Sequence, residues 1–272
     1  MSKAGSLACV GIGMMLGAHI GARARATIEG ADVVFMAVSD PLVELWLQGM
    51  HRDVRSLQPC YGGGRSRRQA YADMVGLMLC EVRAGQRVCA AFYGHPGVFA
   101  VAPHQAIAQA RAEGYTAHME PGISAEDCLY ADLGLDPGAT GCQHFEAGQF
   151  LQYRRQVDRG ALLVLWQVGM AVSGPGGRQL SMGAWQRLLL QRLLQDYPAD
   201  HHVTLYEAAT LATARPRIEG MRLSGLGGAG LHPQTTLVLP PCAALQRDRA
   251  MLEEIAAIEA AEPGFTTIQT TD

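Results

Sequence analysis

A segment rich in arginine and tyrosine, YGGGRSRRQAY, is the first candidate for chemistry and spans residues 61–71. Three glycines make a flexible entry, and a helix after them would place Arg67 and Tyr71, four residues apart, on one face. An arginine at a helix N-terminus opposes the helix dipole, and this local cost invites a functional reason. A solvated basic turn explains the same residues. A phosphate-binding P-loop is disfavoured because no Lys-Ser/Thr pair ends the segment.

A second candidate is the loop YGHPGVFA, residues 93–100, which follows the apolar run RVCAAF. Glycine has no Cβ, so a turn between two glycines lets the backbone approach another group closely. The pattern predicts a strand that ends in a tight turn, with a tyrosine and a histidine beside the point of approach.

Three further patterns carry less weight. GIGMMLG (Gly11, Gly13, Gly17) misses the third glycine of a dinucleotide fingerprint by one place, and the next strand ends in Asp40 rather than placing an acid at the usual distance. We therefore interpret it as a tight strand–helix turn. The nine histidines show no ligand spacing, so no metal site is expected. Ser124 does not lie in the GxSxG of a nucleophile elbow.

Strands and helices alternate in the first part of the chain. The expected strands are residues 6–13, 32–40, 86–94 and a short one after 115, and the expected helices are residues 17–31, 65–85 and 103–114. This alternation indicates a parallel α/β layer structure.

The second part differs in character. A short helix is expected at 124–134, where Ser124 and Asp127 approximate a capping box. Strands are expected at 160–169, 202–209 and 235–241, an amphipathic helix at 185–197 and a last helix at 245–262. The prediction is two α/β domains, residues 1–120 and 121–242, followed by a C-terminal helix and tail, residues 243–272.

Composition narrows the function classes. Of 272 residues, 49% are hydrophobic, and the net charge of −3 (22 basic minus 25 acidic residues) predicts no nucleic-acid partner. The seven cysteines form no CxxC pair, which indicates reduced thiols rather than a disulfide framework. No apolar run reaches the length of a membrane span and no signal peptide is recognisable. We expect no membrane association and a cytoplasmic location.

The strings YGHPGVF, PGISAEDC and LWQVG resemble the tetrapyrrole methylase superfamily, the class III methyltransferases that use S-adenosyl-L-methionine. That resemblance implies two α/β domains with the cofactor in the cleft between them. His95 replaces the acid of the family's Gly-Asp-Pro-type loop, and GIGMMLG lacks the family's Gly-Pro-Gly-Asp ending.

These departures point to one branch. YGGGRSRRQAY, YGHPGVF, EPGISAEDCLYADLGLDPG and FEAGQF closely resemble the borosin peptide backbone α-N-methyltransferases, over residues 5–241. Fused borosin enzymes continue into a clasp and a C-terminal substrate peptide, whereas here only residues 243–272 follow. The resemblance therefore predicts the split form, which methylates a separate precursor peptide iteratively as a homodimer. The tail FTTIQTTD is an alternative self-substrate.

The borosin pattern also assigns site residues. It places the catalytic groups at Tyr61, Arg67, Tyr71 and Tyr93. It places the contacts with S-adenosyl-L-methionine, and with the product S-adenosylhomocysteine, at Tyr93, His95, Val98, Phe99, Ser124, Ala125, Gln167, Ala208, Thr235 and Thr236.

A secondary amide nitrogen is a poor nucleophile, because its lone pair is delocalised into the carbonyl and its N–H is very weakly acidic. Our hypothesis is that Tyr71 takes the amide proton, since the charge of Arg67 favours a phenolate. Tyr61 and Tyr93 would hydrogen-bond the amide oxygen and orient it.

Alternatives stay open at this point. The same fold supports a methyltransferase for a small molecule such as a corrinoid, and it could also serve as a binding module without catalysis. The helix LLLQRLLQ and the C-terminal helix are candidates for a dimer interface, although ordinary core packing would explain both.

Overall fold

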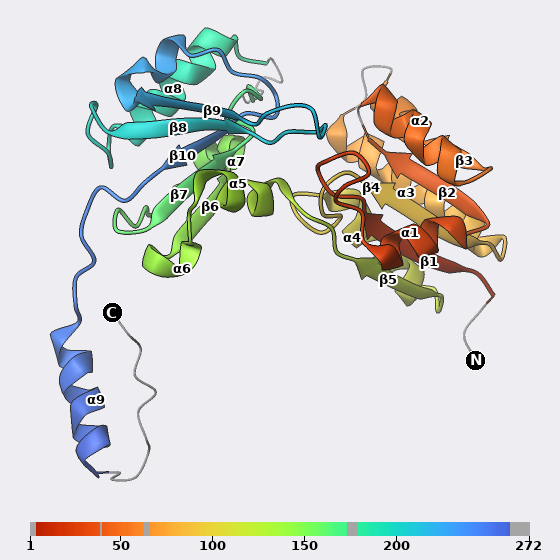
Figure 1. The fold of residues 1–272 in the computed structure, drawn as a ribbon, viewed down its shortest axis with the longest axis horizontal. Coiled ribbons are helices and arrows are strands. Elements are labelled where there is room, and N and C mark those ends of the chain that lie inside the picture. Colours follow the sequence, from red (N-terminus) through yellow and green to blue (C-terminus); the bar gives the residue numbers. More distant parts are fainter. Residues whose placement is uncertain (1–3, 39, 63–65, 173–178, 262–272) are drawn as a thin grey trace.

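Two five-stranded sheets, each covered by helices, form the two halves of the protein in a computed structural model (Figure 1). The structure describes residues 4–38, 40–62, 66–172 and 179–261. The strand orders are β3-β2-β4-β1-β5 and β6-β7-β10-β8-β9. The predicted α/β fold with two domains and a helical C-terminal tail is thereby confirmed. We refer to the halves as the N-terminal and C-terminal domains.

Every strand pair of the first sheet is parallel. Along β1, Leu7 and Cys9 face the helices of one layer, while Ala8 and Val10 face the other layer. Burial on both faces explains why these strands read as unbroken apolar runs. The elements are β1 (Ser6–Gly11), β2 (Val33–Ala37), β3 (Val54–Ser56), β4 (Arg87–Phe92) and β5 (Thr116–Glu120), with α1 (Ala22–Glu29) and α2 (Pro41–Met50) on one face and η1 (Gln58–Tyr61), α3 (Arg67–Arg83) and α4 (Val101–Ala112) on the other.

The second sheet is mixed: β6 and β7 are parallel, and the remaining neighbours are antiparallel. One face packs against α5, and the other against α7 and α8. The elements are α5 (Ala125–Leu133), α6 (Pro137–Thr140), β6 (Cys142–Glu146), α7 (Ala147–Gln152), β7 (Leu162–Trp166), α8 (Met182–Leu193), β8 (His202–Glu207), β9 (Arg217–Arg222), η2 (Leu223–Gly228) and β10 (Thr236–Leu239).

The helix caps follow the sequence closely. Ser124 and Asp127 form the predicted capping box at the start of α5, because the Ser124 hydroxyl accepts from the Asp127 amide and the Asp127 carboxylate accepts from the Ser124 amide. The predicted helix at 17–31 is shorter than expected, since α1 begins only at Ala22. The loop expected between the last two strands of the sheet contains a further strand, β9.

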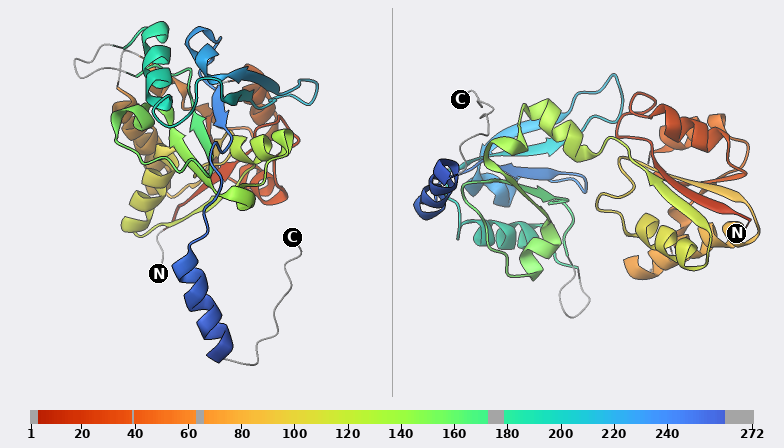
Figure 2. Two further views of the ribbon diagram at one scale, coloured as in Figure 1. Left: turned by 90° about the vertical axis from the view of Figure 1, so that its left-hand side faces the viewer. Right: turned by 90° about the horizontal axis from the view of Figure 1, so that it is seen from below.

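The two apolar helices at the C-terminal end behave differently. In α8, Trp185, Leu189 and Leu193 are fully buried, so core packing accounts for most of its apolar face. The last helix, α9 (Arg249–Ala261), has no buried residue and lies away from both sheets (Figures 1 and 2). The segment FTTIQTTD lies outside the described residues.

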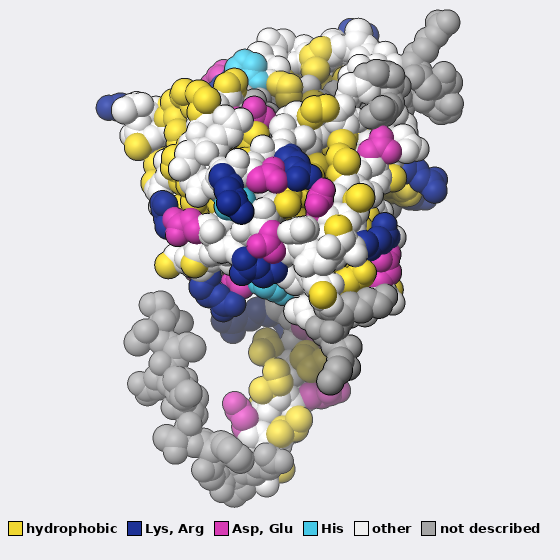
Figure 3. Space-filling view, turned by 90° about the vertical axis from the view of Figure 1, so that its right-hand side faces the viewer, with side chains coloured by type: hydrophobic (Ala, Val, Ile, Leu, Met, Phe, Trp, Pro, Cys, Tyr) yellow, Lys and Arg dark blue, Asp and Glu magenta, His cyan; other side chains and the backbone are white. Residues whose placement is uncertain are grey.

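Charges of both signs are interspersed on the outer face of the N-terminal domain (Figure 3). Several form ion pairs, such as Arg87 with Asp32 at 2.8 Å and Arg55 with Glu81 at 2.6 Å. Within the described part of the chain, no helix is long and apolar enough to cross a membrane.

Three glycines meet where β1, β4 and β5 end. A Cβ on Gly122 would lie 2.3 Å from the Gly94 carbonyl oxygen and 2.8 Å from the Gly11 Cα, and a Cβ on Gly11 would lie 2.6 Å from the same oxygen. Gly13 and Gly94 add two backbone hydrogen bonds, of 3.2 and 2.9 Å, between the two turns. Only glycine permits this approach, and it fixes the turn that leads out of β4.

We expect Gly122→Ala to lower the free energy of unfolding by about 2–3 kcal/mol, because backbone atoms of two other segments must move to admit the methyl group. Gly76→Ala is the matched control: Gly76 lies inside α3 with nothing near its would-be Cβ, so the same change should stabilise by about 0.5–1 kcal/mol. Urea unfolding measures both. Equal effects of the two substitutions would show that the glycine contact does not constrain the fold.

Candidate active site

A cleft of about 810 Å³ opens between the two domains. Its walls combine side chains that are far apart in sequence, from the carboxyl-terminal side of the first sheet and from the ends of β6 and β7 in the second. Six of the predicted site residues line it together: Tyr61, Arg67, Tyr71, Tyr93, Phe99 and Gln167. Glu146 and Gln149 also line it.

The arginine and two of the tyrosines are placed by η1 and α3. Tyr61 ends η1, Arg67 is the first residue of α3, and Tyr71 follows one turn later. Ser66 caps the helix, since its hydroxyl accepts a 3.2 Å hydrogen bond from the Gln69 amide. The predicted shared face of Arg67 and Tyr71 is confirmed, because both reach the cleft. Gly63, Gly64 and Arg65 lie outside the described residues.

The three phenols interact with one another and with Arg67. The rings of Tyr61 and Tyr71 lie edge to face, with centroids 6.3 Å apart. Desolvation by the surrounding protein raises the pKa of Tyr61 to about 12, with a further contribution from the neighbouring phenols that outweighs the opposing charge of Arg67. Desolvation also raises the pKa of Tyr93, again helped by Tyr71 and opposed by Arg67. Tyr61 and Tyr93 therefore stay protonated at neutral pH and can donate hydrogen bonds.

Both domains place a strained residue at the cleft. Among the described residues, Phe99 (φ 51°) and Gln167 (φ 58°) are the two that adopt a positive φ without being glycine. The Phe99 ring lies 5.9 Å from the ring of Trp166, the neighbour of Gln167. Non-glycine residues in this conformation cluster at functional sites, because the surroundings must compensate their cost.

The turn after β4 is stabilised by hydrogen bonds between its own residues. The His95 ring nitrogen Nδ1 accepts a 2.8 Å hydrogen bond from the Gly97 amide, and the His95 carbonyl accepts from the Val98 amide at 3.2 Å. The histidine that replaces the acid of the related loops thus braces the turn from within. Val98 and Phe99 are left exposed at its tip.

The remaining predicted cofactor residues are not part of the lining of the cleft. Ser124 is buried and its hydroxyl bonds the Asp127 carboxylate at 2.7 Å. Thr235 and Thr236 are also buried, while Ala125 and Ala208 pack against the core beneath α5. Ser124 lies close to the glycine contact, with its Cα 3.9 Å from a Cβ built on Gly94.

Sequence reasoning did not identify Glu146 and Gln149 as site residues, although both lie in the quoted string FEAGQF. Glu146 caps α7 by accepting a 2.7 Å hydrogen bond from the Gln149 amide. The sequence reasoning also missed Glu207, whose carboxylate accepts a 2.6 Å hydrogen bond from the Thr235 hydroxyl. Across the described residues, no group of three or more His, Cys, Asp or Glu side chains could hold a metal ion.

Comparisons with known proteins agree on a family. A family model described as Tetrapyrrole (Corrin/Porphyrin) Methylases matches residues 6–220. The chain is similar to a gymnopeptides precursor with a methyltransferase from Gymnopus fusipes, at 41% identity over 88% of this chain and 58% of that protein. It is also similar to a methyltransferase/type I borosin cyclic peptide precursor from Coprinopsis marcescibilis, at 37% identity over 96% of this chain and 69% of that protein.

A third relative, a methyltransferase/omphalotin A precursor from Omphalotus olearius, is 41% identical over 79% of this chain and 52% of its own length. The chain thus spans between about half and two thirds of the length of these relatives. Among solved structures, uroporphyrin-III-C-methyltransferase from Thermus thermophilus has a TM-score of 0.61 at 21% identity, covering 91% of this chain and all of that one. Diphthine synthase has a TM-score of 0.60 at 16% identity, covering 88% and 91%. These structures share the fold.

The left-handed backbone at Gln167 gives a prediction. Gln167→Val should lower the free energy of unfolding by about 1–2 kcal/mol more than Gln167→Gly does, because a β-branched residue is strained at positive φ and glycine is not. Urea titrations of the two variants and the wild type provide the measurement. If valine is tolerated as well as glycine, the strain at this position is not imposed by the fold.

Proposed function

Because the chain belongs to the tetrapyrrole (corrin/porphyrin) methylase family, in its borosin methyltransferase branch, we propose that it methylates backbone amide nitrogens of a peptide with S-adenosyl-L-methionine. The printed names of its relatives couple a methyltransferase to a ribosomally made peptide precursor, which supports a peptide substrate.

One observation carries the proposal. Three phenols and one guanidinium converge on the cleft from the N-terminal domain, opposite Gln167 of the C-terminal domain. Two of the phenols are kept as hydrogen-bond donors by their raised pKa values. Donors beside a group that can accept a proton are what an amide needs before its nitrogen can react.

The residues suit the proposed cofactor. The cleft volume lies in the range of small-molecule sites, and the exposed rings of Tyr93 and Phe99 offer contact area to the apolar parts of the ligand. When bound, S-adenosyl-L-methionine supplies a methyl group on a sulfonium and leaves as S-adenosylhomocysteine. We propose that it is held on one side by Tyr93, His95, Val98, Phe99, Ser124 and Ala125, and on the other side by Gln167, Ala208, Thr235 and Thr236.

The proposed roles of the phenols follow from their surroundings. Tyr61 and Tyr93 donate hydrogen bonds to the carbonyl oxygen of the reacting amide, which stabilises the negative charge that develops there. Tyr71 acts as a phenolate, which the charge of Arg67, one helical turn before it, stabilises. The phenolate takes the amide proton and becomes a neutral phenol while the nitrogen takes the methyl group and the sulfonium becomes a neutral thioether. The nitrogen then carries a methyl group where it carried hydrogen, so each cycle adds one CH2 to the peptide.

We further propose that the peptide is a separate precursor that passes through the cleft iteratively. An extended chain can present its amides one after another, provided that the cleft encloses it. The last described helix, α9, lies beyond the C-terminal domain and away from the N-terminal domain (Figures 1 and 2).

Co-expression with the short open reading frames that neighbour its gene tests the function. We expect the intact mass of one such peptide to rise in steps of one CH2, with fragment ions placing each step on the backbone. Tyr71→Phe should reduce the rate by about 100-fold or more, since a general base contributes that much, while binding of S-adenosyl-L-methionine is retained.

Two results would contradict the proposal. If Tyr71→Phe binds the cofactor and methylates the peptide at a near-normal rate, Tyr71 is not the general base. Methylation of the chain itself, with every separate peptide left unchanged, would exclude a separate precursor while keeping the peptide chemistry.

A homodimer is the proposed assembly, with α9 at its interface. A helix of 13 residues is marginal by itself in water, and α9 has no buried residue in one copy of the chain. Met251, Ile255 and Ile258 recur at helical spacing and are all exposed. None of the seven cysteines is in a disulfide, which suits a reducing compartment, and we propose a cytoplasmic location.

We expect the double substitution Ile255→Glu and Ile258→Glu to shift the protein from dimer to monomer, because charges would have to be buried at the interface. Ala260→Glu, on the opposite side of α9, is the control and should leave the dimer intact. Size-exclusion chromatography with light scattering gives the masses. A dimer that survives the double substitution would place the interface elsewhere.

A further inference from the structure

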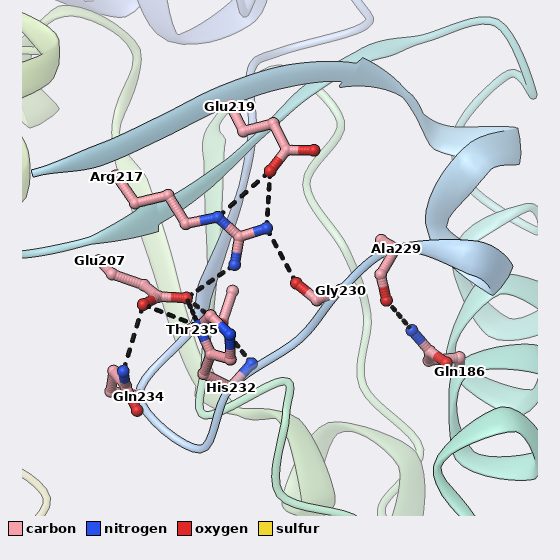
Figure 4. A network of polar contacts seen from close by, with 9 residues as sticks. All are labelled: Gln186, Glu207, Arg217, Glu219, Ala229, Gly230, His232, Gln234 and Thr235. Carbon is pink, nitrogen blue, oxygen red and sulfur yellow. Dashed lines mark hydrogen bonds and ion pairs between the residues drawn. The ribbon is translucent and has the colours of Figure 1, made fainter.

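The carboxylate of Glu207 gathers hydrogen bonds from four side chains at the end of β8 (Figure 4). Its side chain is 11% exposed. The shortest contact comes from the Thr235 hydroxyl at 2.6 Å, and the Arg217 guanidinium donates at 2.8 Å. The His232 ring nitrogen Nδ1 lies 2.9 Å away, and the Gln234 amide donates at 3.2 Å. One carboxylate therefore joins β8, β9 and the segment that leads into β10.

That segment is a closed turn against the end of β7. The His232 amide donates to the Thr235 hydroxyl at 2.7 Å, and the Thr235 amide donates to the His232 carbonyl at 2.9 Å. The Thr235 carbonyl accepts from the Val168 amide at 2.9 Å. Gly169 admits the turn, since a Cβ there would lie 1.9 Å from the His232 oxygen. The backbone beside Gln167 is thus connected to Glu207 through Thr235.

Arg217 ties the same carboxylate to the outer strand. It donates to Glu219 at 2.6 Å and to the Gly230 carbonyl at 2.8 Å, so it bridges β9 and the segment before the turn (Figure 4). Burial alone would raise the pKa of Glu207, but the hydrogen bonds from Thr235, Arg217 and His232 outweigh burial and hold the pKa below its ordinary value. The group is ionised at neutral pH, and its acceptor capacity is taken up by protein donors.

From this geometry we infer that Glu207 is the positioning residue for the C-terminal half of the cofactor site. The inference rests on the proposed function and extends it. Ala208 follows Glu207 directly, Thr235 bonds it, Thr236 is the next residue, and Gln167 precedes the Val168 amide that Thr235 binds. Four of the six proposed cofactor contacts of this domain are therefore at most three links from one carboxylate, where a link is a hydrogen bond or a peptide bond. Glu207 itself does not line the cleft.

Loss of the Glu207 carboxylate should lower the affinity for the cofactor without an equal fall in kcat. The phenols and Arg67 belong to the N-terminal domain, so they keep their places when the Glu207 contacts weaken. Glu207→Gln removes the charge that Arg217 and His232 require and leaves an isosteric amide. We expect the Kd and the KM for S-adenosyl-L-methionine to rise about 10-fold, as for the loss of a hydrogen bond to a charged group, with kcat at saturating cofactor within about 3-fold of wild type.

Calorimetric titration of the full chain with S-adenosyl-L-methionine and with S-adenosylhomocysteine tests this inference, with steady-state kinetics on the methylated peptide as the second readout. Glu219→Gln is the matched control, because Glu219 accepts hydrogen bonds from Arg217 but does not contact Glu207. The affinity of this variant for S-adenosyl-L-methionine should stay within about 2-fold of wild type. If Glu207→Gln does not fold, Arg217→Gln breaks the same tie from the exposed strand and should weaken binding in the same direction.

Folded Glu207→Gln that binds the cofactor as wild type does would overturn the inference, and so would a kcat loss that equals the KM rise. An equal loss of affinity in Glu219→Gln would also overturn it, because the effect would then not depend on Glu207. Failure of the wild type to bind S-adenosyl-L-methionine is a different result, which overturns the proposed function itself.

Discussion

The close contact of three backbones at Gly11, Gly94 and Gly122 is the constraint on which the site depends. Carboxyl ends of parallel strands share one edge of a sheet, and here β1, β4 and β5 approach so closely that a single methyl group would separate them. The turn after β4 leaves this contact in a fixed direction, which places Tyr93 and Phe99 at the cleft. The start of α5 is fixed from the same point, because Ser124 follows Gly122 by two residues.

The electrostatics of the cleft keep Tyr61 and Tyr93 protonated. Desolvation makes an anion on Tyr61 or on Tyr93 unfavourable, and such an anion would also repel negative charge on the neighbouring phenols, so the pKa values of these two groups are raised. Arg67 opposes this tendency from the first turn of α3, at a small cost against the helix dipole. One guanidinium among three phenols therefore suits a site in which one phenol gives up its proton while two keep theirs.

Local patterns predicted much of this arrangement. The alternating apolar runs identified the first sheet, and Ser124 with Asp127 identified the start of α5, because both signals lie within a few residues. Strand β9 was missed because Arg217–Arg222 is mostly exposed and lacks an apolar period. The helix α2 was also missed, although an N-cap residue followed by proline, Asp40 and Pro41, is a typical sequence signal for the start of a helix. The donors to Glu207 lie 10 to 28 residues away from it, so only the folded sheet brings them together.

Strain on both walls of the cleft links the glycine contact to the Glu207 contacts. Phe99 and Gln167 each hold a backbone conformation that costs about 1–3 kcal/mol for a residue with a side chain. Such a residue relaxes unless its flanking backbone is fixed. Phe99 is fixed through the turn that leaves the glycine contact, and Gln167 through Val168, Thr235 and the carboxylate behind them. Since the two walls are fixed separately, a ligand between them meets groups that are already in place, and little conformational entropy remains to be lost on binding.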